Sequence, residues 1–219
     1  LHPPSDAFLR EDEVLKEQVY PLRLLTCKDC GLLQIDCRVD PSILYQKNYL
    51  YESSTTETGR RHYNEMARDI VETFSMPKGS LAVDVGSNVG VLLQGFKDAG
   101  MKVLGVDPAK NIAQKAIDSG IDTIVDFFNF DVAKKISSKY GKAKVITGTN
   151  VFAHLHEIDD AVEGMKELLD EDGVIAIEAP YAVELLENLE YDTVYLEHIG
   201  YLSVKPMQMY FKKFDLELF

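Results

Sequence analysis

From Leu81 onward the sequence alternates short apolar runs with amphipathic stretches, and this alternation limits the folds open to the chain. Buried strands are expected at residues 81–86, 102–107, 121–125, 143–150 and 174–180. Helices with apolar residues at helical spacing are expected at residues 91–99, 108–120, 131–141 and 161–169. The run DEDG, at residues 170–173, is expected to turn into the last strand. Apolar strands separated by helices predict a doubly wound parallel sheet of the α/β class, covered on both faces.

The region before this sheet is of a different kind. Residues 1–56 are irregular and rich in Pro, Asp, Cys and Tyr, with short extended runs in PLRLLTC and GLLQID. An amphipathic helix is expected at residues 56–76. We therefore predict an N-terminal module at 1–56 and an α/β domain at 57–219. The chain begins at Leu1 and stops in FDLELF, which resembles a strand, so the second domain is expected to be C-terminally incomplete.

The charge balance narrows the class of partner. The 219 residues carry a net charge of −13, and 46% of them are hydrophobic. A nucleic-acid partner is not expected, because binding to phosphate backbones is mostly electrostatic and needs a basic face. The sequence has no apolar run of membrane-spanning length and no signal peptide pattern. We expect a cytoplasmic protein that acts on a small molecule.

Glycines and a carboxylate gather where the first two strands end. Gly86 allows a tight turn out of the first strand, and Gly90 lets the next helix pack close enough for its N-terminal amides to face a ligand. Asp107 ends the second strand about 20 residues after Gly86, where a carboxylate can accept hydrogen bonds from ribose hydroxyls. A glycine-rich turn alone is weak evidence for a ligand. Together these residues predict a nucleoside site.

The glycine spacing discriminates between two possible cofactors. Dinucleotide folds use G-x-G-x-x-G, whereas residues 84–90 read D-x-G-x-x-x-G. This pattern resembles the first motif of Rossmann-like S-adenosylmethionine-dependent methyltransferases. The resemblance implies that Asp84 faces the ammonium of the cofactor and that Asn88 lies in the same site. An NAD-linked oxidoreductase is the alternative interpretation.

Two later strand ends carry further candidates. The resemblance implies an adenine contact from Asp126 and Phe127, although Phe127 and Phe128 fit plain core packing equally well. It also implies that Asn150 and His154 lie near the methyl-sulfonium group. His156 lies further along the chain, and we expect it to cap a helix or to face solvent.

The cysteines predict half of a metal site. Cys27 and Cys30 have the C-x-x-C spacing of one side of a tetrahedral zinc site. Cys37 stands alone, and no second pair closes the other side. The alternative is a pair of reduced thiols in a turn.

The order of motifs along the chain is more specific. The segments YPLRLLTCKDCGLLQI, VDPSILYQKNYLYESS, DVGSNVGVLL, GVDPAKNIAQKA, NVFAHLHEIDDAVEGMKELL and YDTVYLEHIGYLS resemble the sugar C-methyltransferase family over almost the whole chain. That family acts on nucleotide-linked keto-deoxysugars. The resemblance implies a Rossmann-like class I methyltransferase sheet with a small irregular zinc-ribbon-like module at the N-terminus.

Several positions depart from the family pattern. The family module uses two cysteine pairs, and the first pair is absent, so zinc is expected only in a longer form of the protein. Val89 replaces a usual acidic residue and Leu196 a usual histidine.

The resemblance also implies a mechanism. A carbon attacks a sulfonium only after losing a proton that a neighbouring keto group has acidified, and His198 suits that proton transfer near neutrality. Glu197 and Tyr195 orient the base, bind the sugar or stabilise the enolate oxygen. Tyr51, with Tyr49 as a substitute, reaches the same pocket. In a flat strand Tyr195 and Glu197 face away from His198, so the segment must bend.

Two other functions remain open from the sequence. One is a class I methyltransferase that acts on oxygen or nitrogen, where the base matters less. The other is a non-catalytic domain that binds S-adenosylmethionine. The sequence sets neither the sugar nor the oligomeric state.

Overall fold

The computed structural model describes residues 1–5, 8–46 and 49–219. The chain divides into two compact units. We call Leu1–Leu44, Asn150–His156 and Glu178–Phe219 the hairpin unit, and Tyr45–Thr149 and Glu157–Ile177 the sheet unit. The N-terminal module and α/β domain expected from the sequence remain predictions.

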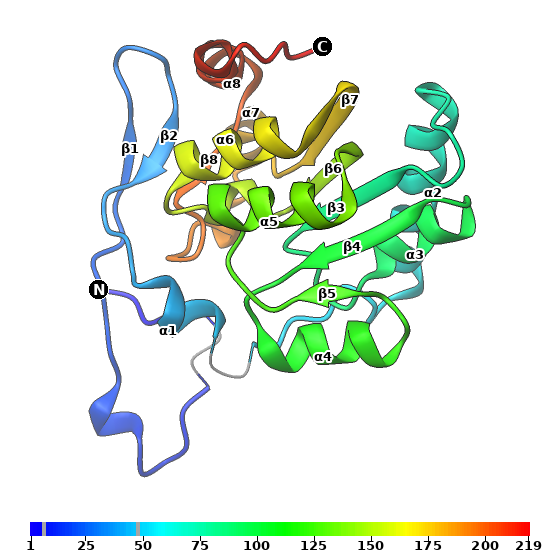
Figure 1. The fold of residues 1–219 in the computed structure, drawn as a ribbon. Helices are drawn as coiled ribbons and strands as arrows, with labels where there is room; N and C mark the ends of the chain where they lie inside the picture. Colours follow the sequence, from blue (N-terminus) through cyan, green and yellow to red (C-terminus); the bar gives the residue numbers. More distant parts are fainter. Residues whose placement is uncertain (6–7, 47–48) are drawn as a thin grey trace. The chain divides into compact units, whose positions relative to one another are not determined.

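The sheet unit contains the predicted α/β sheet (Figure 1). Its strands are β3 (Leu81–Val85), β4 (Lys102–Val106), β5 (Thr123–Ile124), β6 (Ala143–Thr149) and β7 (Leu169–Glu178). They lie in the order β5-β4-β3-β6-β7, with β3 parallel to both β4 and β6 and β4 parallel to β5. The strand order therefore reverses between β3 and β6, which is the switch point where such sheets bind ligands.

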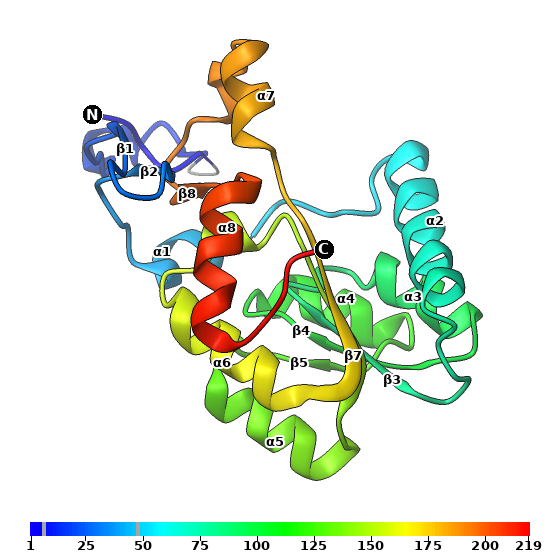
Figure 2. The same ribbon diagram turned by 90° about the horizontal axis from the view of Figure 1, so that it is seen from above.

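Helices cover both faces of this sheet. They are α2 (Glu57–Thr73), α3 (Val91–Asp98), α4 (Lys110–Asp118), α5 (Phe130–Tyr140) and α6 (Ile158–Leu168). Figures 1 and 2 show α2, α3 and α4 on one face and α5 and α6 on the other. The core under α2 and α3 contains Ile70, Leu93, Phe96 and Val145, all buried. The doubly wound fold predicted from the sequence is confirmed.

Side-chain caps begin two of these helices. Thr56 caps α2 by accepting a hydrogen bond from the Gly59 N–H at 3.0 Å, and Asn129 caps α5 through the Val132 N–H at 2.8 Å. Helix α4 begins at Lys110 rather than at Pro108, because Ala109 is still extended.

One predicted turn is wrong. The DEDG run lies inside β7, which begins at Leu169. Lys144 on β6 forms ion pairs with Asp170, at 3.1 Å, and with Asp172, so the acidic side chains have a partner along the strand. Gly173 leaves room for the neighbouring strand, since a Cβ there would lie 2.9 Å from the Ala143 carbonyl oxygen.

The hairpin unit has a small antiparallel sheet of its own. Its strands are β1 (Leu24–Thr26), β2 (Leu33–Ile35) and β8 (Gly200–Tyr201). Leu33 pairs with Tyr201 and Gln34 with Gly200, so the polar segment near the C-terminus is fixed to the N-terminal hairpin. The Ile35 N–H also donates to the Ile199 carbonyl oxygen at 3.0 Å.

Short helices complete the chain. They are η1 (Val14–Lys16), α1 (Pro41–Tyr45), η2 (Phe152–His154), α7 (Ala182–Glu187), η3 (Tyr191–Thr193), α8 (Val204–Phe211) and η4 (Lys212–Phe214). The strand expected in FDLELF is absent from the described residues, because Asp215 takes a left-handed conformation after η4 and residues 216–219 follow without regular structure. Among the described residues, every helix is too short or too polar to cross a bilayer.

Helix α3 packs close to α2 at a glycine. A Cβ on Gly95 would lie 2.8 Å from the Ala67 Cβ and 3.3 Å from the Asn64 Cα. This close approach draws the two helices together over the buried face of β3.

We expect Gly95→Val to lower the free energy of unfolding by about 1–3 kcal/mol, because the added side chain overpacks the contact between the helices. Thermal unfolding followed by circular dichroism should show a Tm lower by roughly 2–4 °C for each kcal/mol. Gln94→Ala on the same helix is the control and should shift stability by less than about 0.5 kcal/mol. An unchanged Tm for Gly95→Val would mean that the helices can separate at no cost.

Candidate functional site

The turn after β3 has the backbone of a ligand-binding loop. Gly86, Asn88 and Gly90 have φ angles of +70°, +50° and +80°, a region that L side chains other than Asn and Asp rarely adopt. Gly90 also allows close packing, since a Cβ there would lie 3.1 Å from two side-chain carbons of Ile121. Larger side chains are therefore disfavoured at Gly86 and Gly90, the two glycines predicted from the sequence to shape this turn.

Asp107 ties this turn to the end of β4. Its Oδ2 accepts a hydrogen bond from the Asn88 N–H at 2.9 Å, and its Oδ1 accepts one from the Ala109 N–H at 2.8 Å. Burial raises the pKa of the Asp107 carboxyl, and the two backbone donors oppose the rise. Each carboxylate oxygen has more than one lone pair, so the group can still accept hydrogen bonds from a ligand.

Asp84 is a second buried carboxyl, inside β3. Its Oδ1 accepts a hydrogen bond from the Thr147 Oγ1 at 2.6 Å. Burial raises the pKa of Asp84 to about 7, and the charge of Asp107 adds to the rise while the Thr147 hydroxyl opposes it. Asp84 is therefore near its midpoint at neutral pH, and a nearby cation would favour its ionised form.

The residues predicted around the adenine divide into two groups. Asp126 is exposed, and its Oδ1 accepts a hydrogen bond from the Phe127 N–H at 2.8 Å. Phe127 is half-buried, whereas Phe128 is buried and belongs to the core. Phe127 is thus the ring that remains available for stacking.

Tyr51 and Asn150 lie in different units. Tyr51 belongs to the sheet unit, where its carbonyl oxygen accepts a hydrogen bond from the Asn88 Nδ2 at 3.0 Å. Asn150 follows β6 and belongs to the hairpin unit. It has a φ of +52°, and its N–H donates to the Glu178 carbonyl oxygen at 2.7 Å.

His198 lies at the centre of a polar cluster in the hairpin unit. Its Nδ1 is 2.9 Å from the Thr193 carbonyl oxygen, and its Nε2 is 2.7 Å from the Tyr195 hydroxyl. A carbonyl oxygen can only accept, so Nδ1 carries the proton and Nε2 is the basic nitrogen that accepts from Tyr195. The segment bends at Tyr195, whose carbonyl oxygen accepts from the His198 N–H at 3.1 Å. The bend expected from the sequence is present.

Burial keeps this imidazole uncharged at neutral pH. Burial lowers the pKa of His198, while the Thr193 carbonyl and the charge of Glu197 oppose the change. The His154 ring lies 4.9 Å from the His198 ring, and burial together with His198 lowers the pKa of His154 to about 3. Burial also raises the pKa of Tyr201 to about 12. At neutral pH the cluster holds neutral rings, with one basic nitrogen facing a phenol.

The residues beside His198 are also buried. The Glu197 Oε1 accepts a hydrogen bond from the Ser5 N–H at 2.8 Å, which links the start of the chain to the cluster. Leu196 is fully buried. His156 is half-buried, and its Nδ1 lies 3.2 Å from the carbonyl oxygen of His154, the last residue of η2, which fits the expected helix cap. Its Nε2 lies 2.7 Å from the Val39 carbonyl oxygen, a contact that the sequence did not predict.

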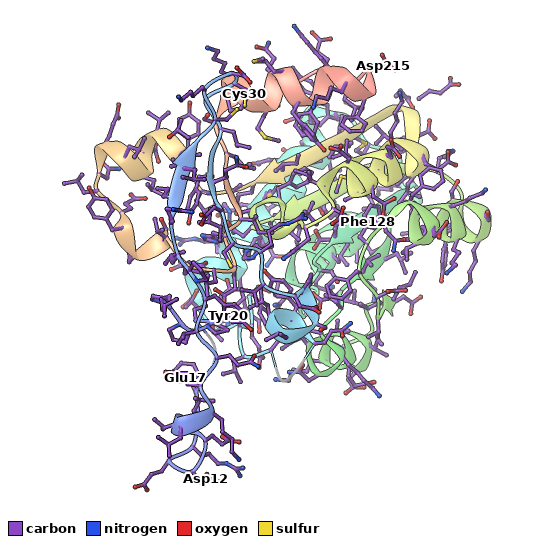
Figure 3. All side chains as sticks on the ribbon, turned by 90° about the vertical axis from the view of Figure 1, so that its left-hand side faces the viewer. Asp12, Glu17, Tyr20, Cys30, Phe128 and Asp215 are labelled. Atoms are coloured by element: carbon purple, nitrogen blue, oxygen red, sulfur yellow. The ribbon has the colours of Figure 1, made fainter. Side chains whose placement is uncertain are left out.

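The cysteine pair forms a turn between β1 and β2, with Cys30 at the tip of the hairpin (Figure 3). The Gly31 N–H donates to the Cys27 carbonyl oxygen at 3.0 Å, and Gly31 has a φ of +84°. Backbone hydrogen bonds from Cys30 and Asp29 lower the pKa of the Cys27 thiol. Among the described residues, no three His, Cys, Asp or Glu side chains are placed to hold a metal ion, so two thiols alone do not fit a tetrahedral zinc site.

A family model described as a methyltransferase domain matches residues 59–219. The chain belongs to the methyltransferase domain family. A second family model, described as "Putative zinc binding domain", matches residues 1–45. The chain is also similar to C-methyltransferase NovU of Streptomyces niveus, with 34% identity over 208 residues. The match covers 95% of this chain and 49% of that protein, so the chain spans about half the length of its curated relative.

Solved structures show the same fold. One is a SAM dependent methyltransferase from Archaeoglobus fulgidus, with a TM-score of 0.55, 16% identity, and coverage of 69% of this chain and 66% of that one. Another is the plantazolicin methyltransferase BpumL in complex with a pentazolic desmethylPZN analog and SAH, with a TM-score of 0.50, 15% identity, and coverage of 72% and 57%. The Rossmann-like methyltransferase fold expected from the sequence is thereby confirmed.

The family implies S-adenosylmethionine as the cofactor, and the residues at the end of the sheet fit it. Asp84 and Asp107 are carboxyls beneath the glycine turn, which suit a cationic amino-acid tail and ribose hydroxyls. When bound, S-adenosylmethionine would be held by this turn and by Asp107. The individual contacts of the predicted cofactor residues stay predictions.

Some residues of the site were not predicted from the sequence. The Thr147 hydroxyl donates to Asp84, far away in the chain, and the Thr193 carbonyl oxygen accepts from His198, a few positions away. A lone threonine belongs to no sequence motif that would reveal either contact. Ser87 is buried, and its Oγ has no hydrogen-bond partner among the residues described. Gly105 makes room for it, since a Cβ there would lie 3.0 Å from the Ser87 Cβ.

Asp84→Asn should stabilise the protein more at high pH than at low pH. The folded pKa of about 7 lies above the ordinary value of 3.8, so wild-type stability falls as pH rises from about 4 to about 7 and then levels off. Asparagine carries no such proton and can still accept from Thr147. Thermal unfolding between about pH 4 and 9 should therefore show the difference in Tm widening up to about pH 7.

Thr147→Val tests the cause of this behaviour. It removes the hydroxyl that opposes the rise in the Asp84 pKa. The loss of stability with rising pH should therefore continue to a higher pH in this variant than in the wild type. A constant difference between wild type and Asp84→Asn at every pH would mean that Asp84 is not a buried titrating group.

Proposed function

We propose that this protein is an S-adenosylmethionine-dependent C-methyltransferase that methylates the carbon next to the keto group of a nucleotide-linked deoxysugar. Membership of the methyltransferase domain family and similarity to C-methyltransferase NovU support methyl transfer to carbon. The sugar and the nucleotide follow from the motif resemblance described above. A cytoplasmic location, where an activated sugar would be met, belongs to the same proposal.

The arrangement of Thr193, His198 and Tyr195 carries the proposal. The Thr193 carbonyl holds the His198 proton on Nδ1, which leaves Nε2 as a base in hydrogen-bond contact with the Tyr195 hydroxyl. Burial keeps the imidazole neutral, so it is ready to accept a proton at neutral pH. For methylation of oxygen or nitrogen the base matters less, because those atoms already carry a lone pair.

The chemistry requires a carbon nucleophile. A keto group makes the neighbouring C–H acidic, and removing that proton yields an enolate whose carbon can attack an electrophile. Bound S-adenosylmethionine supplies a methyl group on a sulfonium as that electrophile. The residues of this chain contribute the proton transfer, the orientation of the sugar and the exclusion of water.

Tyr195 and His198 act as a pair in this proposal. Tyr195 is partly exposed and His198 is buried, so the phenol oxygen is the atom that reaches the substrate carbon. The phenol gives its proton to His198 Nε2 as it takes the proton from carbon, and the charge on the imidazolium is stabilised by the Thr193 carbonyl and Glu197. The motif resemblance implies that Tyr51 supplies a hydroxyl to the sugar. The His154 ring lies 4.9 Å from the His198 ring and is uncharged at neutral pH.

Proton exchange without cofactor tests the carbon chemistry. A nucleotide-linked keto-deoxysugar in D₂O should exchange its α-proton when the wild-type protein is present and S-adenosylmethionine is withheld. Tyr195→Phe and His198→Ala should each slow exchange and turnover by about 10²–10⁴-fold, the usual contribution of a general base. The proton signal is followed by NMR, and cofactor binding by calorimetry should be unchanged.

Tyr191→Phe is the matched control, because Tyr191 is a largely exposed tyrosine of the same segment. It should exchange and turn over at the wild-type rate. No exchange with the wild-type protein would remove the enolate mechanism and favour transfer to oxygen or nitrogen. Exchange that persists in both His198→Ala and Tyr195→Phe would assign the base elsewhere.

The pH dependence of turnover follows from the lowered pKa of His198. The base is lost only when the pH falls below the ordinary histidine value of about 6.5, so kcat/KM should be flat near neutrality with an acid limb centred below that value. Glu197→Gln removes a charge that raises this pKa and should move the limb to still lower pH. Initial rates at saturating cofactor measure the pH profiles of the wild type and of Glu197→Gln. An acid limb centred above about pH 6.5 in the wild type would contradict a buried neutral imidazole.

A further inference from the structure

The segment that carries Tyr51 is tied down at three points within the sheet unit. We call Tyr49–Ser53 the tyrosine segment. The Asn111 Nδ2 on α4 donates to the Tyr49 carbonyl oxygen at 2.8 Å, and Lys115 on the same helix forms an ion pair with Glu52. The third tie is Asn88 in the glycine turn after β3. All three partners follow β3 or β4, at the cofactor end of the sheet.

Asn88 uses its backbone and its side chain for different purposes. The backbone N–H donates to Asp107, which holds the glycine turn. The side-chain Oδ1 accepts from the Ser53 N–H at 3.0 Å and from the Val89 N–H at 2.9 Å, and Nδ2 donates to the Tyr51 carbonyl oxygen at 3.0 Å. The partners fix the orientation of the amide, because backbone N–H groups only donate and a carbonyl oxygen only accepts.

The amide is therefore occupied by the protein itself. Asn88 is buried, with 8% of its surface exposed, and both ends of its amide have backbone partners. Its φ of +50° is a conformation that Asn tolerates better than most residues, and it aims the side chain at the tyrosine segment. A residue between the two glycines would otherwise be taken for a cofactor ligand.

We propose that Asn88 is a positioning residue that holds Tyr51 at the cofactor turn. The side chain of Asn88 fixes the main chain of the tyrosine segment on both sides of Glu52, and so sets where the Tyr51 phenol can reach. The functional part of this inference rests on the proposed function, in which Tyr51 contacts the sugar. The structural part stands on the hydrogen bonds alone.

The test replaces Asn88 by glycine, which accepts a φ of +50° without strain and removes only the side chain. Without any ligand, exchange of the Ser53 amide hydrogen should become about tenfold faster, the factor that corresponds to one net hydrogen bond. Asn88→Asp keeps the acceptor for the Ser53 N–H and loses the donor to Tyr51, so it should retain most of that protection. Hydrogen exchange of residues 49–56, followed by NMR or mass spectrometry, measures both.

Two variants on α4 provide a matched pair. Asn111→Ala removes an amide that binds the tyrosine segment, whereas Gln114→Ala removes an amide that binds only Asp118 on its own helix. The first should speed exchange in the tyrosine segment, and the second should leave it unchanged. Unchanged exchange of Ser53 in Asn88→Gly would overturn the inference.

Turnover distinguishes a positioning residue from a cofactor ligand. Asn88→Gly should lower kcat about as much as Tyr51→Phe does and leave the KM for S-adenosylmethionine within about twofold, and the double variant should be no worse than Tyr51→Phe, because residues that act through one another are not additive. A loss confined to cofactor affinity, or additive losses in kcat, would show that Asn88 does not act through Tyr51. If the wild-type protein turns over no keto-sugar, the proposed function fails, and the hydrogen-exchange result still decides whether Asn88 holds the tyrosine segment.

Discussion

A buried carboxylate, Asp107, joins the two loops on which the cofactor end of the sheet depends. One oxygen accepts from the Asn88 N–H in the turn after β3, and the other accepts from the Ala109 N–H at the start of α4. Residues with positive φ in the first turn cost conformational free energy, and charge-assisted hydrogen bonds of this kind offset that cost. The same turn then holds the tyrosine segment through the Asn88 side chain.

The hairpin unit solves a different physical problem. It must keep His198 and Tyr201 buried without charging them, because an unpaired charge out of water is costly. Backbone groups supply hydrogen bonds in this cluster: the Thr193 carbonyl accepts from His198, and the Ile199 N–H donates to the Ala153 carbonyl oxygen at 2.7 Å. These bonds hold the rings in place, and burial leaves a neutral imidazole with its basic nitrogen on a phenol.

Periodic and local signals were readable from the sequence. Apolar runs and helical spacing predicted the strands and helices of the sheet unit. Gly86 and Gly90 were recognised because their roles depend on their own backbone, and Asp107 because of its spacing after Gly86. The DEDG run was misread, since Lys144 on the neighbouring strand pairs with its acidic residues and keeps it extended. The contact of His156 with the Val39 carbonyl oxygen was not predicted, because Val39 is far away in the chain.

The sequence by itself determined the α/β class, the family and the short list of groups able to do the chemistry, because each of these depends on residue type and on spacing along the chain. Only the tertiary structure decided how those groups are used. It showed that Asn88 binds the tyrosine segment, that Thr147 bonds to Asp84, and that β8 pairs with β2 near His198. These are contacts between residues distant in sequence, and their geometry is set by the packing of the whole unit.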